Sequence, residues 1–138
     1  MALTSSFARR FHLLTLLRAS LVAGAVYDFS FAVLMATAPQ VPARMFNLPL
    51  PPLPEGRFYL WILGTLLTML AALYLAAARD PRRYSAIIGI AIGGRALGAL
   101  VFALAALTGD GLGGLIPLAV ADLTFSVVHA GAWFPIRS

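Results

Sequence analysis

Residues 84–108 read YSAIIGIAIGGRALGALVFALAALT, and this stretch decides the fold. It is an unbroken apolar run with a single charged side chain, Arg95, near its middle. A helix of about 20 residues, rising about 1.5 Å per residue, is long enough to cross a hydrocarbon core of about 30 Å. The run therefore predicts a transmembrane helix that carries a guanidinium near mid-bilayer depth.

Three further runs of the same character occur in the chain. We expect transmembrane helices at about 11–38, 57–78, 83–108 and 112–135. Hydrophobic residues make up 61% of the chain and charged residues 11%, and the mean hydropathy of +0.91 belongs to the whole chain. This composition is far from that of a soluble domain. We therefore predict an all-α, integral membrane four-helix bundle that forms a single transmembrane domain over residues 1–138.

The start of the chain also has some features of a cleavable signal peptide. Arg9 and Arg10 precede an apolar stretch that ends in the small residues 36–38. However, Pro39 directly after these small residues is a poor context for cleavage, and Asp28 interrupts the apolar region. We expect the first helix to be retained.

The segment 39–56 holds six of the nine prolines and predicts a proline-rich external loop. Proline lacks a backbone donor and favours extended, turn-like geometry. Within the loop, residues 41–48 are expected to form one interfacial turn, with Met45 and Phe46 dipping toward lipid.

The basic residues near the helix ends are distributed unevenly. One side holds Arg9, Arg10, Arg18, Arg79, Arg82, Arg83 and Arg137, and the other holds Arg44 and Arg57. Cytoplasmic loops are enriched in such residues, so both termini are expected to be cytoplasmic. The remaining connectors, 79–83 and the glycine-rich 109–114, are short enough to join antiparallel helices.

Several classes of function are excluded by composition. The net charge of +5 comes from ten arginines, but these mostly lie at the ends of apolar runs, where they orient helices against anionic lipid, so we predict no nucleic-acid partner. The absence of cysteine excludes thiol chemistry and cysteine-ligated metals. No phosphate loop, nucleophile elbow, metal motif or dinucleotide fingerprint is present. We predict no metal and no cofactor, apart from a quinone as a conceivable ligand.

Three ionisable residues fall at nearly the same depth in three of the predicted helices. Asp28 and Asp122 lie about ten residues from the ends of their runs, and Arg95 about eleven. A charge at the bilayer centre costs about 2.5–3.5 kcal/mol on insertion scales. We therefore expect these side chains to face one another.

Two interpretations of this trio stay open at this point. It is either a structural salt bridge that fixes the order of the helices, or a site that binds a proton or a ligand. Its formal charge is −1, so we expect one carboxyl to hold a proton at neutral pH. Asp28 and Asp122 are accordingly the candidate catalytic residues.

Small and polar residues lie on the same helix faces as the trio. Ser20 and Gly24 precede Asp28 at helical spacing, and other small or polar residues accompany Arg95 and Asp122. The candidate ligand-binding set is Tyr27, Asp28, Gly94, Arg95, Gly98, Asp122, Ser126 and His129.

Plainer interpretations apply to parts of this set. The glycines of 83–108 are typical of close helix packing. His129 is expected to be solvated or satisfied at the cytoplasmic interface, since no motif supports haem ligation. The helix at 57–78 carries only Thr65 and Thr68 as polar residues in its middle, so we expect it to face lipid or a partner.

The order of features resembles the DoxX-like group of small four-helix bacterial membrane proteins. The resemblance rests on Tyr27-Asp28, the entry to the second helix at Arg57-Phe58-Tyr59, Gly64, the connector 78–83, Arg95 and Asp122. It implies a four-helix bundle in the bacterial cytoplasmic membrane, in some relatives the membrane subunit of a quinone-linked oxidoreductase or an accessory protein. It implies no catalytic residue.

Three functions are compatible with these features. The first is a lipophilic-ligand-binding or accessory subunit, whose pocket around Asp28, Arg95 and Asp122 serves a quinone, an isoprenoid or a partner membrane subunit. The second is a membrane-embedded isomerase or cyclase that uses the two carboxyls as acid and base. The third is a dimeric proton-coupled transporter, because a carboxyl in the first of four short helices also resembles small multidrug exporters. Arg95 argues against a cationic substrate in the third case.

Overall fold

A computed structural model describes residues 2–52, 54–109 and 112–137, which form helices and no strands. The elements are α1 (Ala2–Thr37), α2 (Gln40–Met45), α3 (Glu55–Arg79), α4 (Ser85–Thr108), the short 3-10 helix η1 (Gly113–Leu115) and α5 (Ile116–Trp133). The predicted all-α class is confirmed. Four stretches within these elements are long and apolar enough to cross a membrane: Ala8–Thr37, Glu55–Arg79, Ser85–Thr108 and Gly113–Trp133.

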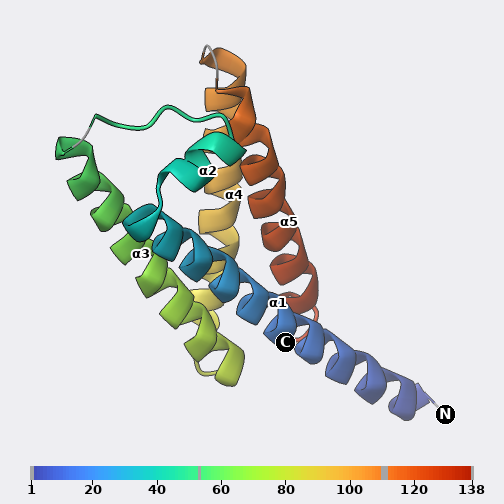
Figure 1. Cartoon of the computed structure of the whole chain (residues 1–138). Coiled ribbons are helices and arrows are strands. Elements are labelled where there is room, and N and C mark those ends of the chain that lie inside the picture. Colours follow the sequence, from blue (N-terminus) through green and yellow to red (C-terminus); the bar gives the residue numbers. More distant parts are fainter. Residues whose placement is uncertain (1, 53, 110–111, 138) are drawn as a thin grey trace.

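The largest difference from the expected boundaries is at the start of α1, which begins at Ala2 instead of near residue 11. The apolar pattern of the sequence indicates only the part of the helix that is suited to hydrocarbon, from about residue 11 onward. The helix continues beyond it because no proline or glycine interrupts the chain before Gly24. In Figure 1 these first turns run past the ends of the other helices. Residues 110 and 111 of the expected glycine turn lie outside the described residues.

Prolines mark most of the helix ends. Helix α1 ends at Thr37, two residues before Pro39, and α3 ends at Arg79, two residues before Pro81. Proline disfavours the helical conformation of the residue before it and cannot donate to the preceding turn. Pro117 instead occupies the first turn of α5, where no donor is needed.

The loop between α1 and α3 contains a real helix, α2, where only one interfacial turn was expected. Asn47 follows it with φ of 50°, a left-handed conformation that Asn tolerates. The N–H of Leu48 then donates to the carbonyl of Ala43 at 2.8 Å, and that of Asn47 donates to Arg44 at 3.4 Å. This pattern closes α2 with a Schellman motif and turns the chain back over the helices.

The long helices pack as two pairs, α1 with α3 and α4 with α5, which are joined mainly where α1 meets α5. Figure 1 shows α1 crossing α3, with α4 and α5 beside each other. The approach of α1 to α3 is close at Gly64, where an added Cβ would lie 3.2 Å from the carbonyl oxygen of Ala32. A small residue is required there because backbone lies opposite.

An apolar cluster holds the four long helices together at one end of the molecule. Its buried members are Leu17, Leu21, Ala77, Ala78, Ile88, Ala132 and Trp133. Arg18 also connects α1 to the end of α3, because its Nη2 donates a hydrogen bond to the carbonyl of Arg79 at 3.4 Å. The first half of α1, the end of α3, the start of α4 and the end of α5 therefore meet at the same end.

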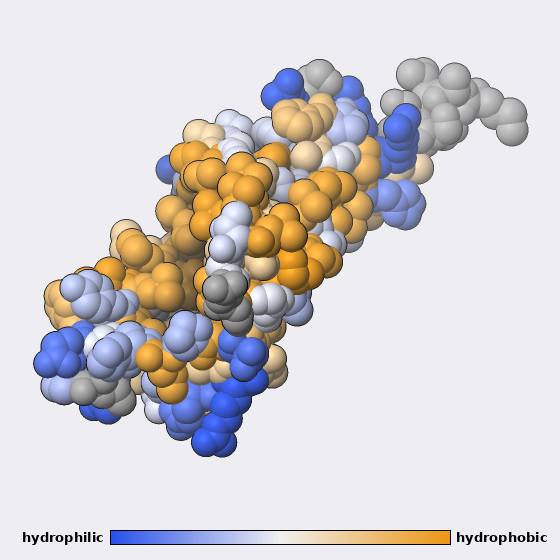
Figure 2. All heavy atoms as spheres, turned by 90° about the horizontal axis from the view of Figure 1, so that it is seen from above, coloured by the Kyte–Doolittle hydropathy of each residue, from blue (hydrophilic) through white to orange (hydrophobic). Residues whose placement is uncertain are grey.

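The outer surface of the helices is apolar. Large hydrophobic side chains on every long helix are exposed, among them Phe29, Leu66, Leu104 and Val127. Figure 2 shows apolar residues across the middle of the visible face and hydrophilic ones gathered toward its two ends. In water so large an apolar surface would be strongly unfavourable, whereas in lipid it is the natural exterior.

Candidate functional site

Three charged side chains from three helices meet in the interior. Asp28 of α1, Arg95 of α4 and Asp122 of α5 are only 2%, 7% and 6% exposed. Arg95 Nη2 donates to Asp28 Oδ1 at 2.6 Å, and Nη1 donates to Asp122 Oδ1 at 2.5 Å. The predicted convergence of the two acids on the arginine is therefore confirmed as a buried salt-bridge network.

Aromatic rings surround the guanidinium of Arg95. Its Cζ lies 5.2 Å from the ring centroid of Tyr27, 5.5 Å from that of Tyr74 and 5.2 Å from that of Phe125. Ring faces attract a cation, and most strongly where water is excluded. The rings and the two carboxylates together replace the hydration that Arg95 loses. Because Tyr74 belongs to α3, all four long helices contribute to this site.

Tyr74 was missed by sequence reasoning. It lies near the end of its apolar run, where a tyrosine is usually an interfacial residue. The structure instead buries it on the face of α3 that packs against α1, with Gly24 making room for its ring. The expectation that this helix faces lipid or a partner is wrong for that face. Thr65 and Thr68 donate only to carbonyls of their own helix.

Phe125 was also missed, although a signal for it existed. It follows Asp122 by three residues and therefore lies on the same face of α5. The spacing alone does not show whether such an aromatic ring contacts the charged residues or only packs in the apolar interior. Its second neighbour is Tyr27, whose ring centroid lies 5.7 Å away, so the rings around Arg95 also contact each other.

The network leaves hydrogen-bonding positions open. Among the described residues, Asp28 Oδ2 and Arg95 Nε are buried and have no hydrogen-bond partner. A buried polar atom without a partner is costly, and most such atoms in proteins are paired. The site therefore has a spare carboxyl oxygen available to a further group.

Ser126 is committed to a structural contact. Its hydroxyl donates to the backbone carbonyl of Ile92 at 2.9 Å, which ties α5 to α4 one turn from the salt bridges. Ser20, on the face of Asp28, donates to the carbonyl of Leu17 in its own helix. Both hydroxyls lie on the faces that were expected, but each already has an acceptor.

The expectation that His129 is solvated or satisfied at an interface is wrong. The side chain is 0% exposed, and within the described part of the chain neither ring nitrogen has a hydrogen-bond partner. Its ring stacks on Phe125 at 6.0 Å and meets Tyr74 edge-on at 6.1 Å. His129 therefore extends the aromatic cluster around Arg95 toward the apolar cluster that contains Leu17 and Trp133.

The two candidate glycines of α4 have different surroundings. An added Cβ at Gly98 would lie 2.6 Å from Asp122 Oδ2, so this glycine is part of the site. An added Cβ at Gly94 would meet nothing within 4 Å, and the residue is exposed. The prediction for Gly94 is wrong because one helical step of about 100° turns it away from the face of Arg95.

A cavity of about 240 Å³ opens beside the salt bridges. Its lining is formed by Tyr27, Asp28, Phe31, Met35, Leu48, Leu63, Leu67, Arg95, Phe102, Leu115, Leu118 and Asp122. The walls are therefore almost entirely apolar, and the charged groups are confined to the three residues of the network. Such a combination is typical of sites for small apolar molecules with one polar group.

The turn after α2 covers this cavity from the loop side. Leu48 lines it directly, and Phe46 stacks on Phe31 with ring centroids 5.8 Å apart. Phe31 in turn contacts Tyr27 at 5.0 Å. The expectation that Phe46 dips toward lipid is wrong, since its ring packs on α1, whereas Met45 is exposed.

Across residues 2–52, 54–109 and 112–137, no group of three or more His, Cys, Asp or Glu side chains is arranged to hold a metal ion. The Oδ1 atoms of both acids accept from Arg95, and the positive charge of this guanidinium repels a metal cation.

No protein-family model, curated protein or solved structure matches this chain. The resemblance to DoxX-like proteins therefore stays a prediction.

Proposed function

We propose that the chain is an integral membrane protein of the bacterial cytoplasmic membrane, in which α1, α3, α4 and α5 form an antiparallel four-helix bundle with both termini in the cytoplasm. The apolar cluster at one end supports this orientation, because it gathers alternate helix ends. The arginines of that same end, including Arg18, Arg79 and Arg82, support its cytoplasmic location by the positive-inside rule.

The orientation is tested with reporters fused to the C-terminus and inserted in the loop 39–56. One reporter is active only in the cytoplasm, and the other only outside it. We expect the C-terminal fusion to be active inside and the loop insertion outside. Activity of both fusions on one side, or mixed activity at each, would exclude the proposed topology.

Within this bundle we infer a binding site for a lipophilic molecule that carries one small polar group. This inference is supported by Asp28 Oδ2, which is buried without a hydrogen-bond partner beside an apolar cavity of about 240 Å³. An ionised carboxyl would accept a hydrogen bond from a hydroxyl group, and a protonated one would donate to a carbonyl. The terminal part of an isoprenoid alcohol or the head of a quinone provides such groups.

The site also suits an accessory subunit that holds its ligand for a partner membrane protein. Tyr27, Asp28 and Arg95 are among the residues on which the DoxX-like resemblance rests, and they line the cavity. The apolar outer surface of α3 and α4 leaves room for such a partner in the plane of the membrane.

The ligand hypothesis is tested on protein purified from its native membrane. Bound small molecules are identified by mass spectrometry, and binding is then measured with a short-chain quinone and a short isoprenoid alcohol. We expect binding to raise the thermal stability in detergent, because a ligand specific to the folded state stabilises it by mass action. Asp28→Asn should weaken binding of the molecule that hydrogen-bonds to Oδ2.

Two neighbouring leucines of α3 provide a matched control. Leu67 lines the cavity, whereas Leu66 is exposed on the outer surface. Leu67→Phe should abolish binding by filling the cavity, and Leu66→Phe should leave it unchanged. A ligand-free protein that keeps its fold and stability in Asp28→Asn and Asp122→Asn, and binds neither probe, would overturn the proposal.

A second candidate function is an isomerase or cyclase for a lipophilic substrate. It is favoured by the observation that Asp28 and Asp122 both line the same cavity, on either side of one guanidinium. One carboxyl would give a proton and the other would remove one. Turnover of a bound isoprenoid that is lost in both Asp28→Asn and Asp122→Asn, with binding kept, would distinguish catalysis from binding alone.

A further inference from the structure

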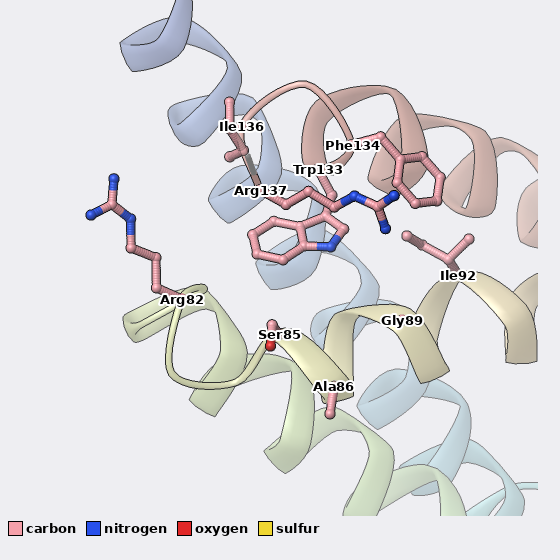
Figure 3. A pocket seen from close by; sticks show the side chains of 9 residues that line it. All are labelled: Arg82, Ser85, Ala86, Gly89, Ile92, Trp133, Phe134, Ile136 and Arg137. Carbon is pink, nitrogen blue, oxygen red and sulfur yellow. The ribbon is translucent and has the colours of Figure 1, made fainter.

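A second hollow lies at the opposite end of the helices from the loop 39–56. It is a groove of about 800 Å³ between the start of α4 and the end of α5. Figure 3 shows its lining: Arg82 projects from the connector before α4, and Arg137 lies beside Trp133 and Phe134. The groove shares no residue with the cavity beside Asp28.

The electrostatics of the groove are one-sided. Two arginines line it and no acidic residue does. Within the described part of the chain, neither Arg82 nor Arg137 forms an ion pair. Arg137 is held instead over the ring of Phe134, with its Cζ 4.5 Å from the centroid. Helix α4 begins at Ser85, so the partial positive charge of its N-terminus adds to that of the arginines.

Apolar and small residues line the groove together with the arginines. Ala86 and Gly89 line it on α4, and an added Cβ at Gly89 would meet nothing within 4 Å. Ile92 continues the same line toward the middle of the helix. The small and apolar residues of α4 thus form a trough that leads from the connector with Arg82 toward the middle of the helix.

We propose that this groove binds an anionic phospholipid, with its headgroup between Arg82 on one side of the groove and Arg137 on the other and an acyl chain over Gly89. A phospholipid joins an anion to an aliphatic chain, and the groove likewise combines two arginines with apolar side chains. Trp133 lies at the depth of the headgroups, where aromatic residues favour the interface. The inference rests on the proposed membrane placement but is independent of the ligand at Asp28.

The test uses Trp133 as a local reporter in the full-length chain, with Trp61→Phe removing the other tryptophan. The protein is reconstituted in vesicles in which either phosphatidylglycerol or phosphatidylcholine carries brominated acyl chains, and fluorescence quenching is compared. We expect stronger quenching by the anionic lipid. The preference should fall about fivefold for each arginine removed in Arg82→Gln and Arg137→Gln.

Control variants separate the groove from general charge effects. Arg44→Gln with Arg57→Gln removes two arginines that do not line the groove and should keep the preference. Gly89→Leu should block the trough, whereas Gly93→Leu, one turn further along α4 and also open, should not. Native mass spectrometry of the wild type with each lipid gives the same comparison without a substitution.

The outcomes are distinct. Equal quenching by the two lipids, or a preference that survives the Arg82→Gln, Arg137→Gln double variant, overturns the lipid site while leaving the membrane placement intact. Quenching by neither lipid overturns both. Displacement of the lipid by millimolar inorganic phosphate would show a site for a free anion and would also overturn the proposal, because the acyl chain would then contribute nothing.

Discussion

Gly98 of α4 lies so close to the carboxyl of Asp122 on α5 that an added Cβ would be 2.6 Å from Oδ2. The carboxyl cannot simply rotate away, because its other oxygen accepts a hydrogen bond from Arg95. The glycine therefore sets the distance between α4 and α5 at the point where the buried charges meet.

Gly98→Ala should lower the free energy of unfolding by about 1–3 kcal/mol, because the new methyl group overpacks the interior and disturbs the ion pair. Gly94→Ala, one turn earlier on the same helix, should leave it unchanged or raise it by up to about 1 kcal/mol, because the position is open and alanine favours a helix. Equilibrium unfolding in mixed micelles measures both. Equal effects of the two substitutions would contradict the assigned packing.

Removing the central cation should be the most damaging single change. Arg95→Gln leaves two carboxyls buried without their partner and should cost about 3–5 kcal/mol of stability. Arg57→Gln, at the exposed start of α3, should change stability by less than about 0.5 kcal/mol. Combining Arg95→Gln with Asp28→Asn and Asp122→Asn should recover part of the loss, since no uncompensated charge remains. A triple variant no more stable than Arg95→Gln would argue against charge burial as the cause.

The ring of Tyr74 should contribute measurably to holding Arg95. Tyr74→Leu removes the ring face at 5.5 Å from the guanidinium, and loss of a desolvated cation–π contact costs about 2 kcal/mol. Tyr59→Leu, at a position that is 68% exposed on the same helix, is the matched control and should have little effect. In the background of Arg95→Gln the cost of Tyr74→Leu should shrink, and a double-mutant cycle measures this coupling.

The turn after α2, which covers the cavity beside Asp28, packs against a glycine of η1. A side chain at Gly114 would overlap the backbone carbonyl of Phe46 at the end of α2. Gly114→Ala should therefore push α2 outward and accelerate amide hydrogen exchange over residues 40–48. Gly113→Ala, where nothing lies within 4 Å of an added Cβ, should not. Unchanged exchange in the Gly114 variant would mean that α2 does not rest on η1.

The apolar runs and the meeting of the charged residues could be predicted from the sequence. Helix length against bilayer thickness is a one-dimensional constraint, so the four long helices follow from hydropathy alone. The same holds for the meeting of Asp28, Arg95 and Asp122, because a lone charge at that depth is too costly to face lipid. Neither inference requires knowledge of which helix is next to which.

The neighbours of these residues were decided by tertiary packing. His129 and Tyr74 both lie near helix ends, where sequence favours an interfacial role, yet the approach of α3 and α5 to α1 buries them. Phe46 turns inward because the Schellman motif at Asn47 directs the chain back over α1. Apart from the stacking of His129 on Phe125 within α5, these contacts join different elements, so no spacing rule could have revealed them.

By itself the sequence determined that this chain forms long apolar helices and must pair its buried charges, because both follow from the cost of exposing polar groups to hydrocarbon. Only the tertiary structure decided that Gly98 and not Gly94 faces Asp122, and that one oxygen of Asp28 is left without a partner next to a cavity. The physical reason is that the rotation and crossing of helices set these details through the packing of many side chains at once.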